Sequence, residues 1–187
     1  MNFSLILMIL VGIGALLIMW CIMTYNRFIR LKNLLKEAWS GIEVQLKRRY
    51  DLIPNLVSTV KGYSVHEKSI FEDVAKYRAE SIGATSVEQK ATAEDGLTGA
   101  LKTLFAVAEN YPDLKANQNF LDLQTQLAAL EDEVQLARRY YNGTVRNFNV
   151  LCTVFPSNLI ASLAGFNQAE YFEVASASER ETPSVKF

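Results

Sequence analysis

Residues 31–60 read LKNLLKEAWSGIEVQLKRRYDLIPNLVSTV, and their apolar side chains recur every three or four positions. This spacing gives a helix one continuous apolar stripe, with charged side chains on the remaining surface. Because the periodicity continues downstream, the sequence predicts a long amphipathic helix over residues 26–82. Pro54 lies inside that range, where it removes a main-chain donor, so we expect a kink or a short break there.

Upstream of this stretch, residues 3–23 read FSLILMILVGIGALLIMWCIM and carry no charge. A helix needs roughly 20 apolar residues to cross a hydrocarbon core of about 30 Å. A cleaved signal peptide is disfavoured because the start has no basic side chain and the segment has no small-residue exit site. The bulky Trp20 before Cys21 also argues against a lipoprotein signal. The sequence therefore predicts a transmembrane anchor over residues 1–24.

Basic side chains follow the anchor, and none precede it. The first four are Arg27, Arg30, Lys32 and Lys36. The positive-inside rule then predicts a single-pass membrane protein, with its N-terminus outside and its body in the cytoplasm. Residues 24–50 hold seven Lys or Arg against two Glu. This basic collar suits contact with anionic lipid, or it is only a topology signal on a solvated helix face.

Two further long helices are predicted downstream, with coiled-coil-like spacing in the second. They cover residues 87–110, and a stretch that Asn119 caps and Pro156 ends. A short apolar helix over residues 158–164 follows, closed by Gly165. Helices of this length joined by short loops favour an all-α fold, in which the transmembrane helix continues into a long antiparallel bundle. The predicted bundle spans residues 25–172, and a polar tail spans 173–187.

Composition argues against most kinds of catalytic site. The 187 residues carry a net charge of −1, which gives no general affinity for nucleic acid, and two Cys, too few for a disulfide framework. His66 has no second His for a zinc site, and Cys152 continues an apolar helix face. The acidic clusters lack the Glu-x-x-His pairs of di-iron bundles. We expect no enzyme activity, no catalytic or metal-binding residues and no cofactor.

Polar residues beside the apolar stripes are the better candidates for a structural or interaction role. These are Arg48, Arg49, Asp51, Pro54, Asn55, Glu131, Arg138, Tyr141 and Asn142. A buried arginine needs a carboxylate partner. We expect Arg48 or Arg49 to pair with Glu131. We expect Arg138 to pair with Asp51 or Glu67, and Asn55 to satisfy a carbonyl freed by Pro54. Such pairs would fix the register of the helices, or the basic cluster would bind a partner.

Two separated regions carry a resemblance to a known family. The first runs through EAWSGIEVQLKRR at residues 37–49, DLIPNLV at 51–57 and VKGY at 60–63. The second includes Glu131, Ala137-Arg138, Tyr141-Asn142, Phe148-Asn149 and Phe155-Pro156. The chain resembles the LemA proteins of bacteria over essentially its whole length. That resemblance implies a membrane anchor before a long-helix bundle, with no established general activity. The family has a magnetosome-associated branch, and genes for membrane proteases lie beside those of its members. The resemblance therefore suggests a role in membrane organisation or envelope maintenance.

Two functions remain open from the sequence. The first is a non-enzymatic, membrane-anchored scaffold that contacts lipid, self-associates into a homo-oligomer and organises or shapes the membrane or envelope. The second is an adaptor or regulator of a membrane protease, a sensor or another envelope protein, bound through the face around Arg48 and Arg49. The apolar run over residues 150–166 would cap the bundle, or it would contact a neighbour or lipid.

Overall fold

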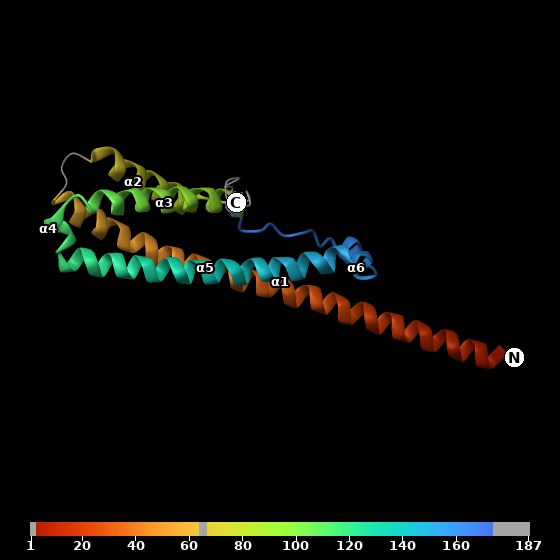
Figure 1. Cartoon of the computed structure of the whole chain (residues 1–187). Helices are drawn as coiled ribbons and strands as arrows, with labels where there is room; N and C mark the ends of the chain where they lie inside the picture. Colours follow the sequence, from red (N-terminus) through yellow and green to blue (C-terminus); the bar gives the residue numbers. More distant parts are fainter. Residues whose placement is uncertain (1–2, 64–66, 174–187) are drawn as a thin grey trace, which may run out of the picture. The chain divides into compact units, whose positions relative to one another are not determined.

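The computed structural model describes residues 3–63 and 67–173, and every regular element within them is an α-helix (Figure 1). The helices are α1 (Phe3–Lys61), α2 (Lys68–Gly83), α3 (Val87–Ala108), α4 (Pro112–Lys115), α5 (Gln118–Thr153) and α6 (Ser157–Ala164). This confirms the predicted all-α fold, in which an apolar N-terminal helix continues into a helical bundle. In the described part of the chain, α1 is the one single helix long and apolar enough to cross a membrane.

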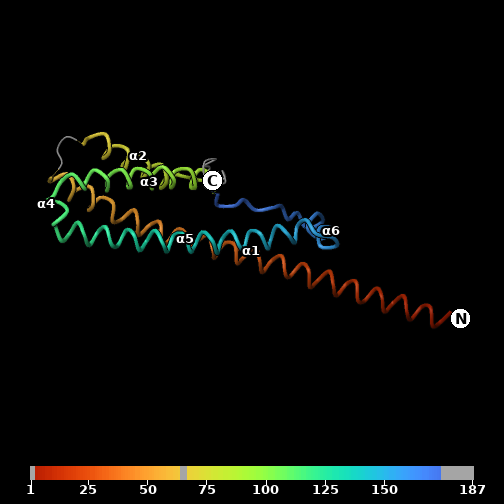
Figure 2. Tube along the Cα trace, in the orientation of Figure 1, coloured from red at the N-terminus to blue at the C-terminus, as the bar shows by residue number. Residues whose placement is uncertain are grey.

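The first helix is one unbroken element of 59 residues, which Figure 2 follows as a continuous coil. A break at Pro54 was one of two predicted outcomes, and it does not occur. Proline cannot donate to the carbonyl four residues earlier, that of Tyr50. Arg78 on α2 donates from Nε to that carbonyl oxygen at 2.9 Å, so the donor is Arg78 rather than the predicted Asn55. The predicted helix over 26–82 divides after Lys61 instead.

The helix ends test the capping residues that the sequence predicts. Ser86 caps α3, because its Oγ accepts a hydrogen bond from the Gln89 main-chain N–H at 3.1 Å. The predicted cap of α5 at Asn119 is wrong, since Asn117 Oδ1 accepts from the Phe120 N–H at 3.1 Å. Gly165 closes α6 at φ 71°, as expected. The turn α4, which starts at Pro112, was not predicted.

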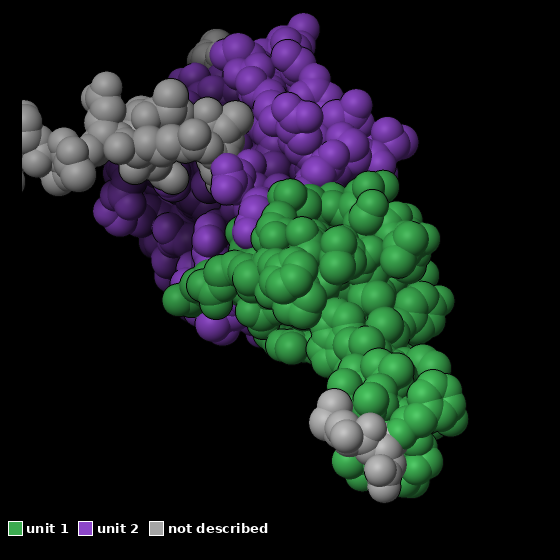
Figure 3. Space-filling view, turned by 90° about the vertical axis from the view of Figure 1, so that its right-hand side faces the viewer, with its two compact units in different colours: residues 1–41, 139–169 green, residues 42–138, 170–187 purple. Residues whose placement is uncertain are grey.

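The chain divides into two compact units, coloured separately in Figure 3. Unit 1 comprises residues 1–41 and 139–169, and unit 2 comprises 42–138 and 170–187. Within unit 1, the core is formed by Phe28 of α1, Phe148 and Leu151 of α5, and Ala161 of α6. The Phe166 ring stacks on that of Phe28, with 4.6 Å between centroids. These contacts hold α6 against both long helices of its unit.

Unit 2 is a bundle of the C-terminal part of α1, the hairpin of α2 and α3, and the first part of α5. The apolar stripe that the sequence predicts on α1 is buried here, and it comprises Ile42, Leu46, Ile53, Leu56 and Val60. Val74, Leu97, Leu104 and Val134 oppose it from the other helices. The helical periodicity therefore identified the core face correctly.

Gly96 and Gly99 give a matched test of packing between α2 and α3. A Cβ at Gly96 would lie 2.5 Å from ring carbons of Tyr77, whereas one at Gly99 would meet nothing within 4 Å. We expect Gly96→Ala to lower the free energy of unfolding by about 1–3 kcal/mol through overpacking. Gly99→Ala should instead raise it by up to about 1 kcal/mol through helix propensity. Thermal unfolding followed by circular dichroism measures both, and equal effects would contradict the close contact.

Candidate functional site

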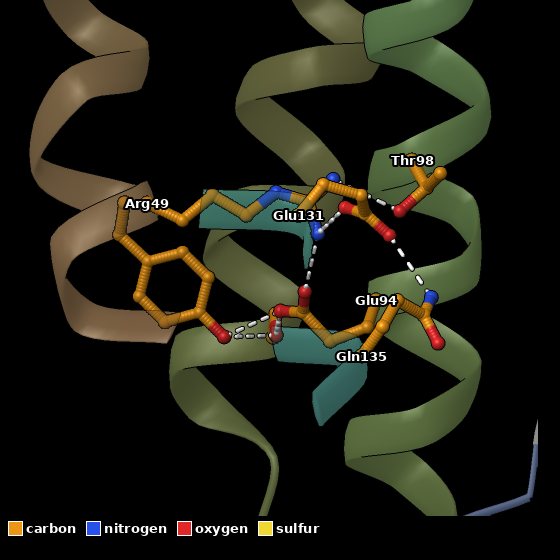
Figure 4. Close-up of polar contacts among 7 residues, drawn as sticks. Arg49, Glu94, Thr98, Glu131 and Gln135 are labelled. Atoms are coloured by element: carbon orange, nitrogen blue, oxygen red, sulfur yellow. Dashed lines mark hydrogen bonds and ion pairs between the residues drawn. The ribbon is translucent and has the colours of Figure 1, made fainter. Parts of the chain in front are cut away.

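Arg49 lies at the centre of a polar cluster inside unit 2 (Figure 4). It is only 3% exposed, because the apolar stripe of α1 carries it into the bundle. Its Nη1 lies 3.1 Å from Glu94 Oε2 on α3 and 3.1 Å from Glu131 Oε2 on α5. Its Nη2 donates to Thr98 Oγ1 at 2.9 Å. The planar guanidinium can hold several acceptors at once, which an ammonium does less well.

The pairing of Arg49 with Glu131 confirms one of the two predicted alternatives. Glu131 is positioned in turn by Gln135, one helical turn further along α5, whose Nε2 donates to Glu131 Oε1 at 3.1 Å. Figure 4 shows Arg49 reaching from α1 between the Glu94 and Glu131 side chains. One arginine thus joins three helices.

Glu94 is the fully buried member of the cluster, and sequence reasoning missed it. The side chain is 0% exposed, and its Oε1 accepts hydrogen bonds from the hydroxyls of Tyr50 and Ser81. Those two hydroxyls also lie within hydrogen-bond distance of each other. A usable signal existed, because Glu94 precedes the apolar Leu97 by three residues and so falls on the buried face of α3. Through Ser81, the cluster reaches α2 as well.

Burial shifts the pKa of two side chains in this region. Burial first, and then the Glu94 carboxylate, raise the pKa of the Tyr50 hydroxyl above its ordinary value of 10.0. Burial also lowers the pKa of the Arg138 guanidinium, an effect that Glu94 and Glu131 oppose. Two arginines and two glutamates therefore balance in charge within one buried region, which lowers the cost of taking each charge out of water.

Arg138 occupies an unexpected environment. It is 7% exposed, and its Cζ lies 4.7 Å from the centroid of the Phe172 ring. Its Nε and Nη2 have no hydrogen-bond partner among the residues that the structure describes. The carboxylates with the largest effect on its pKa are Glu94 and Glu131, rather than the predicted Asp51 or Glu67. A guanidinium over an aromatic face is a cation–π contact. Arg138 and Phe172 thus form a contact within unit 2.

The remaining predicted residues do not join this cluster. Arg48 is exposed, and its Nη1 lies 3.6 Å from Glu133 and donates to Gln45 Oε1 at 3.4 Å, both at the surface. Asp51, Pro54 and Asn55 are exposed as well. The other two belong to unit 1: Tyr141 is buried with its ring 5.5 Å from that of Trp39, and Asn142 is half-buried. The predicted basic binding face is therefore wrong for Arg49, which faces the interior.

The arrangement favours a structural role for the cluster over catalysis. In the cluster, Glu94 binds arginine and hydroxyl groups and Glu131 binds Arg49, so neither faces an open centre. The described residues include no group of three or more His, Cys, Asp or Glu suited to a metal. His66 lies outside the described residues. Cys152 is half-buried against the core of unit 1, where it packs as an apolar side chain.

These features define a membrane-associated, all-helical protein whose helices are joined by a buried ion cluster. The family profile described as the LemA family matches residues 38–187, and the chain belongs to this family. The magnetosome protein MamQ 2 of Paramagnetospirillum magneticum is 29% identical over 190 residues, covering 88% of this chain and 69% of that protein. The protein LemA of Metamycoplasma hominis is 29% identical over 159 residues, covering 83% and 71%.

Removing Arg49 should destabilise the bundle far more than removing its neighbour. Arg49→Met leaves Glu94 buried without its counter-charge, which should cost about 3–5 kcal/mol of unfolding free energy. Arg48→Met removes an exposed contact and should cost less than about 1 kcal/mol. Urea unfolding of the full chain in mild detergent, followed by circular dichroism, compares the two. Similar losses in both variants would argue against a structural role for the cluster.

Stability should fall at alkaline pH through Tyr50. Because its pKa is raised in the folded protein, the unfolded chain releases this proton first as the pH rises past 10.0. The contribution of Tyr50 is then complete below pH 10.0 and declines above it. We expect Tyr50→Phe to make the unfolding free energy less dependent on pH in the alkaline range. Tyr140→Phe, at an exposed tyrosine, is the control and should leave that dependence unchanged.

Proposed function

We propose that the protein is a non-enzymatic, membrane-anchored scaffold that self-associates and organises or shapes the membrane. The observation that carries the proposal is the continuity of α1, one helix of 59 residues from the apolar anchor into the bundle. At about 1.5 Å per residue such a helix is about 90 Å long. No loop separates the anchor from the folded body, so contacts between the bodies of neighbouring copies would act directly on the anchors.

The buried cluster supports a mechanical role. Arg49 binds carboxylates on α3 and α5, and Tyr50 extends the network to Ser81 on α2. A bundle whose register is held in this way transmits a contact made on one helix to the others. Relatives named magnetosome proteins also support work at a membrane.

We further infer an orientation with the N-terminus outside the cell and the body in the cytoplasm, at the inner membrane. Its support is the basic collar: Arg27, Arg30, Lys32 and Lys36 follow the anchor and are exposed. Exposed basic side chains at this position would also contact anionic lipid head groups.

The anchor offers a surface through which copies would meet. A side chain added at Gly12 would meet nothing within 4 Å, and Ala15 lies on the same helix face, three residues later. Small residues on one face allow close approach of a second transmembrane helix. Gly14 lies on a different face and is equally open, so it provides a matched control.

Light scattering of the full chain in mild detergent, with negative-stain imaging, tests the proposal. We expect multimers that persist at high salt, because apolar packing is little screened. Gly12→Ile combined with Ala15→Ile should lower the particle mass, whereas Gly14→Ile should not. A uniform monomer for the unmodified chain would overturn the scaffold function. Equal effects of the two substitutions would place the contact elsewhere on the chain.

A further inference from the structure

A second apolar surface lies outside the anchor, in the α5–α6 corner of unit 1. The sequence carries no charged residue between Arg146 and Glu170. Several large apolar side chains in this stretch are exposed, namely Val150, Val154, Phe155, Leu159 and Leu163. Leu163 is 86% exposed and Phe155 is 77% exposed. A contiguous apolar surface of this kind marks a site of contact with lipid or protein.

The corner is continuous with the surface of the anchor. A groove in unit 1 is lined by Cys21, Ile22 and Tyr25 of α1 and by Ile160, Leu163 and Ala164 of α6. Phe166, just after α6, lies 5.8 Å from the Tyr25 ring and stacks on Phe28, which fixes α6 at this level of α1. The exposed side of α6 therefore continues the apolar surface at the C-terminal end of the anchor.

The position of α6 along α1 gives its depth in the membrane. If residues 3–23 cross a hydrocarbon core of about 30 Å, Cys21 and Ile22 lie at its edge and Tyr25 lies among the head groups. The α6 residues beside them lie at the same depth. An exposed leucine there meets lipid at the acyl boundary rather than water.

The direction of α6 is consistent with a position at the boundary of the membrane. In unit 1 the α5 residue Phe148 packs on Phe28, and Tyr141 packs on Trp39, so α5 runs antiparallel to α1. α6 is bent by 95° from α5. It therefore lies across the axis of the anchor, which is the direction of the membrane plane when the anchor crosses the bilayer with little tilt.

Several main-chain and hydroxyl groups of the corner are bonded within the protein, whereas the buried Asn158 Oδ1 has no hydrogen-bond partner among the described residues. Ser157 Oγ donates to the carbonyl oxygen of Leu151 at 2.7 Å, and the Asn158 N–H donates to that of Val154 at 2.9 Å. Thr153 Oγ1 donates to the Asn149 carbonyl oxygen at 3.0 Å. Main-chain and hydroxyl groups near lipid need such internal partners, because hydrocarbon offers none.

We propose that residues 154–164 are a second membrane contact, which inserts into the acyl boundary of the leaflet through which the anchor reaches the body. With eight residues, α6 is too short to span the bilayer, so it enters one leaflet only. A wedge of apolar side chains in one leaflet expands that leaflet and favours curvature. This inference does not depend on self-association, since one copy provides both the anchor and α6.

Depth-dependent quenching tests the contact in the full-length chain. Cys21→Ala and Cys152→Ala remove the native thiols, and Leu163→Cys then carries an environment-sensitive NBD fluorophore. The protein is reconstituted into phosphatidylcholine–phosphatidylglycerol vesicles that contain lipid with a doxyl quencher on its acyl chain. Leu136→Cys, an exposed position on α5 in unit 2, is the matched control, and Ile18→Cys in the anchor is the positive reference.

We expect doxyl lipid to quench the probe at Leu163 several-fold more than the probe at Leu136, approaching the level at Ile18. Aqueous iodide should quench the probe at Leu136 more strongly than the probe at Leu163. Quenching at Leu163 by iodide alone would overturn the proposal, because the surface would then face water. Protection from both quenchers would overturn it as well and identify a second protein copy as the occupant. Leu159→Cys repeats the test, and circular dichroism confirms that each variant keeps its helical content.

Discussion

The pairing of Arg49 with two carboxylates is the constraint on which the bundle of unit 2 depends. Apolar stripes alone would allow one helix to slide past another by a turn of about 5.4 Å with little loss of buried area. Such a slide would separate Arg49 from Glu94 and Glu131, which lie 3.1 Å away in the observed register. An unpaired buried charge is strongly destabilising. The ion cluster therefore selects one register from those that the hydrophobic effect permits.

Tyr50 links this cluster to the behaviour of Pro54. Its side chain donates to Glu94, and its main-chain carbonyl has lost the intrahelical donor that Pro54 cannot supply. Arg78 bonds to that carbonyl from α2, so the defect in α1 becomes a contact between helices. The proline therefore does not end the helix, because a tertiary partner replaces the missing hydrogen bond.

Some features of the structure follow from the sequence alone, and others do not. The apolar N-terminal helix, the order of the long helices and the core faces were predictable because they depend on local spacing. The need of a buried arginine for a carboxylate predicted that Arg48 or Arg49 pairs with Glu131, and the structure selects Arg49. The partners of Pro54 and Arg138 were not predictable, since Arg78 and Phe172 approach from distant parts of the chain. Glu94 was missed for a different reason. It was not among the predicted site residues, although its spacing from Leu97 places it on the buried face.

The charge-free stretch between Arg146 and Glu170 shows why composition alone does not decide how a segment meets a membrane. It is about as long as the anchor and equally free of charge, but it contains several Asn and Ser residues and bends by 95° between α5 and α6. Pro156 removes a donor at the bend, and Ser157 Oγ bonds the carbonyl of Leu151 in the last turn of α5 and that of Val154 just after it. One face of α6 packs through Ala161 into the core of unit 1, which leaves Leu159 and Leu163 exposed on the rest of the helix. The hydrogen-bonded bend, together with the lower hydropathy, thus separates the short α6 from the unbroken course of α1.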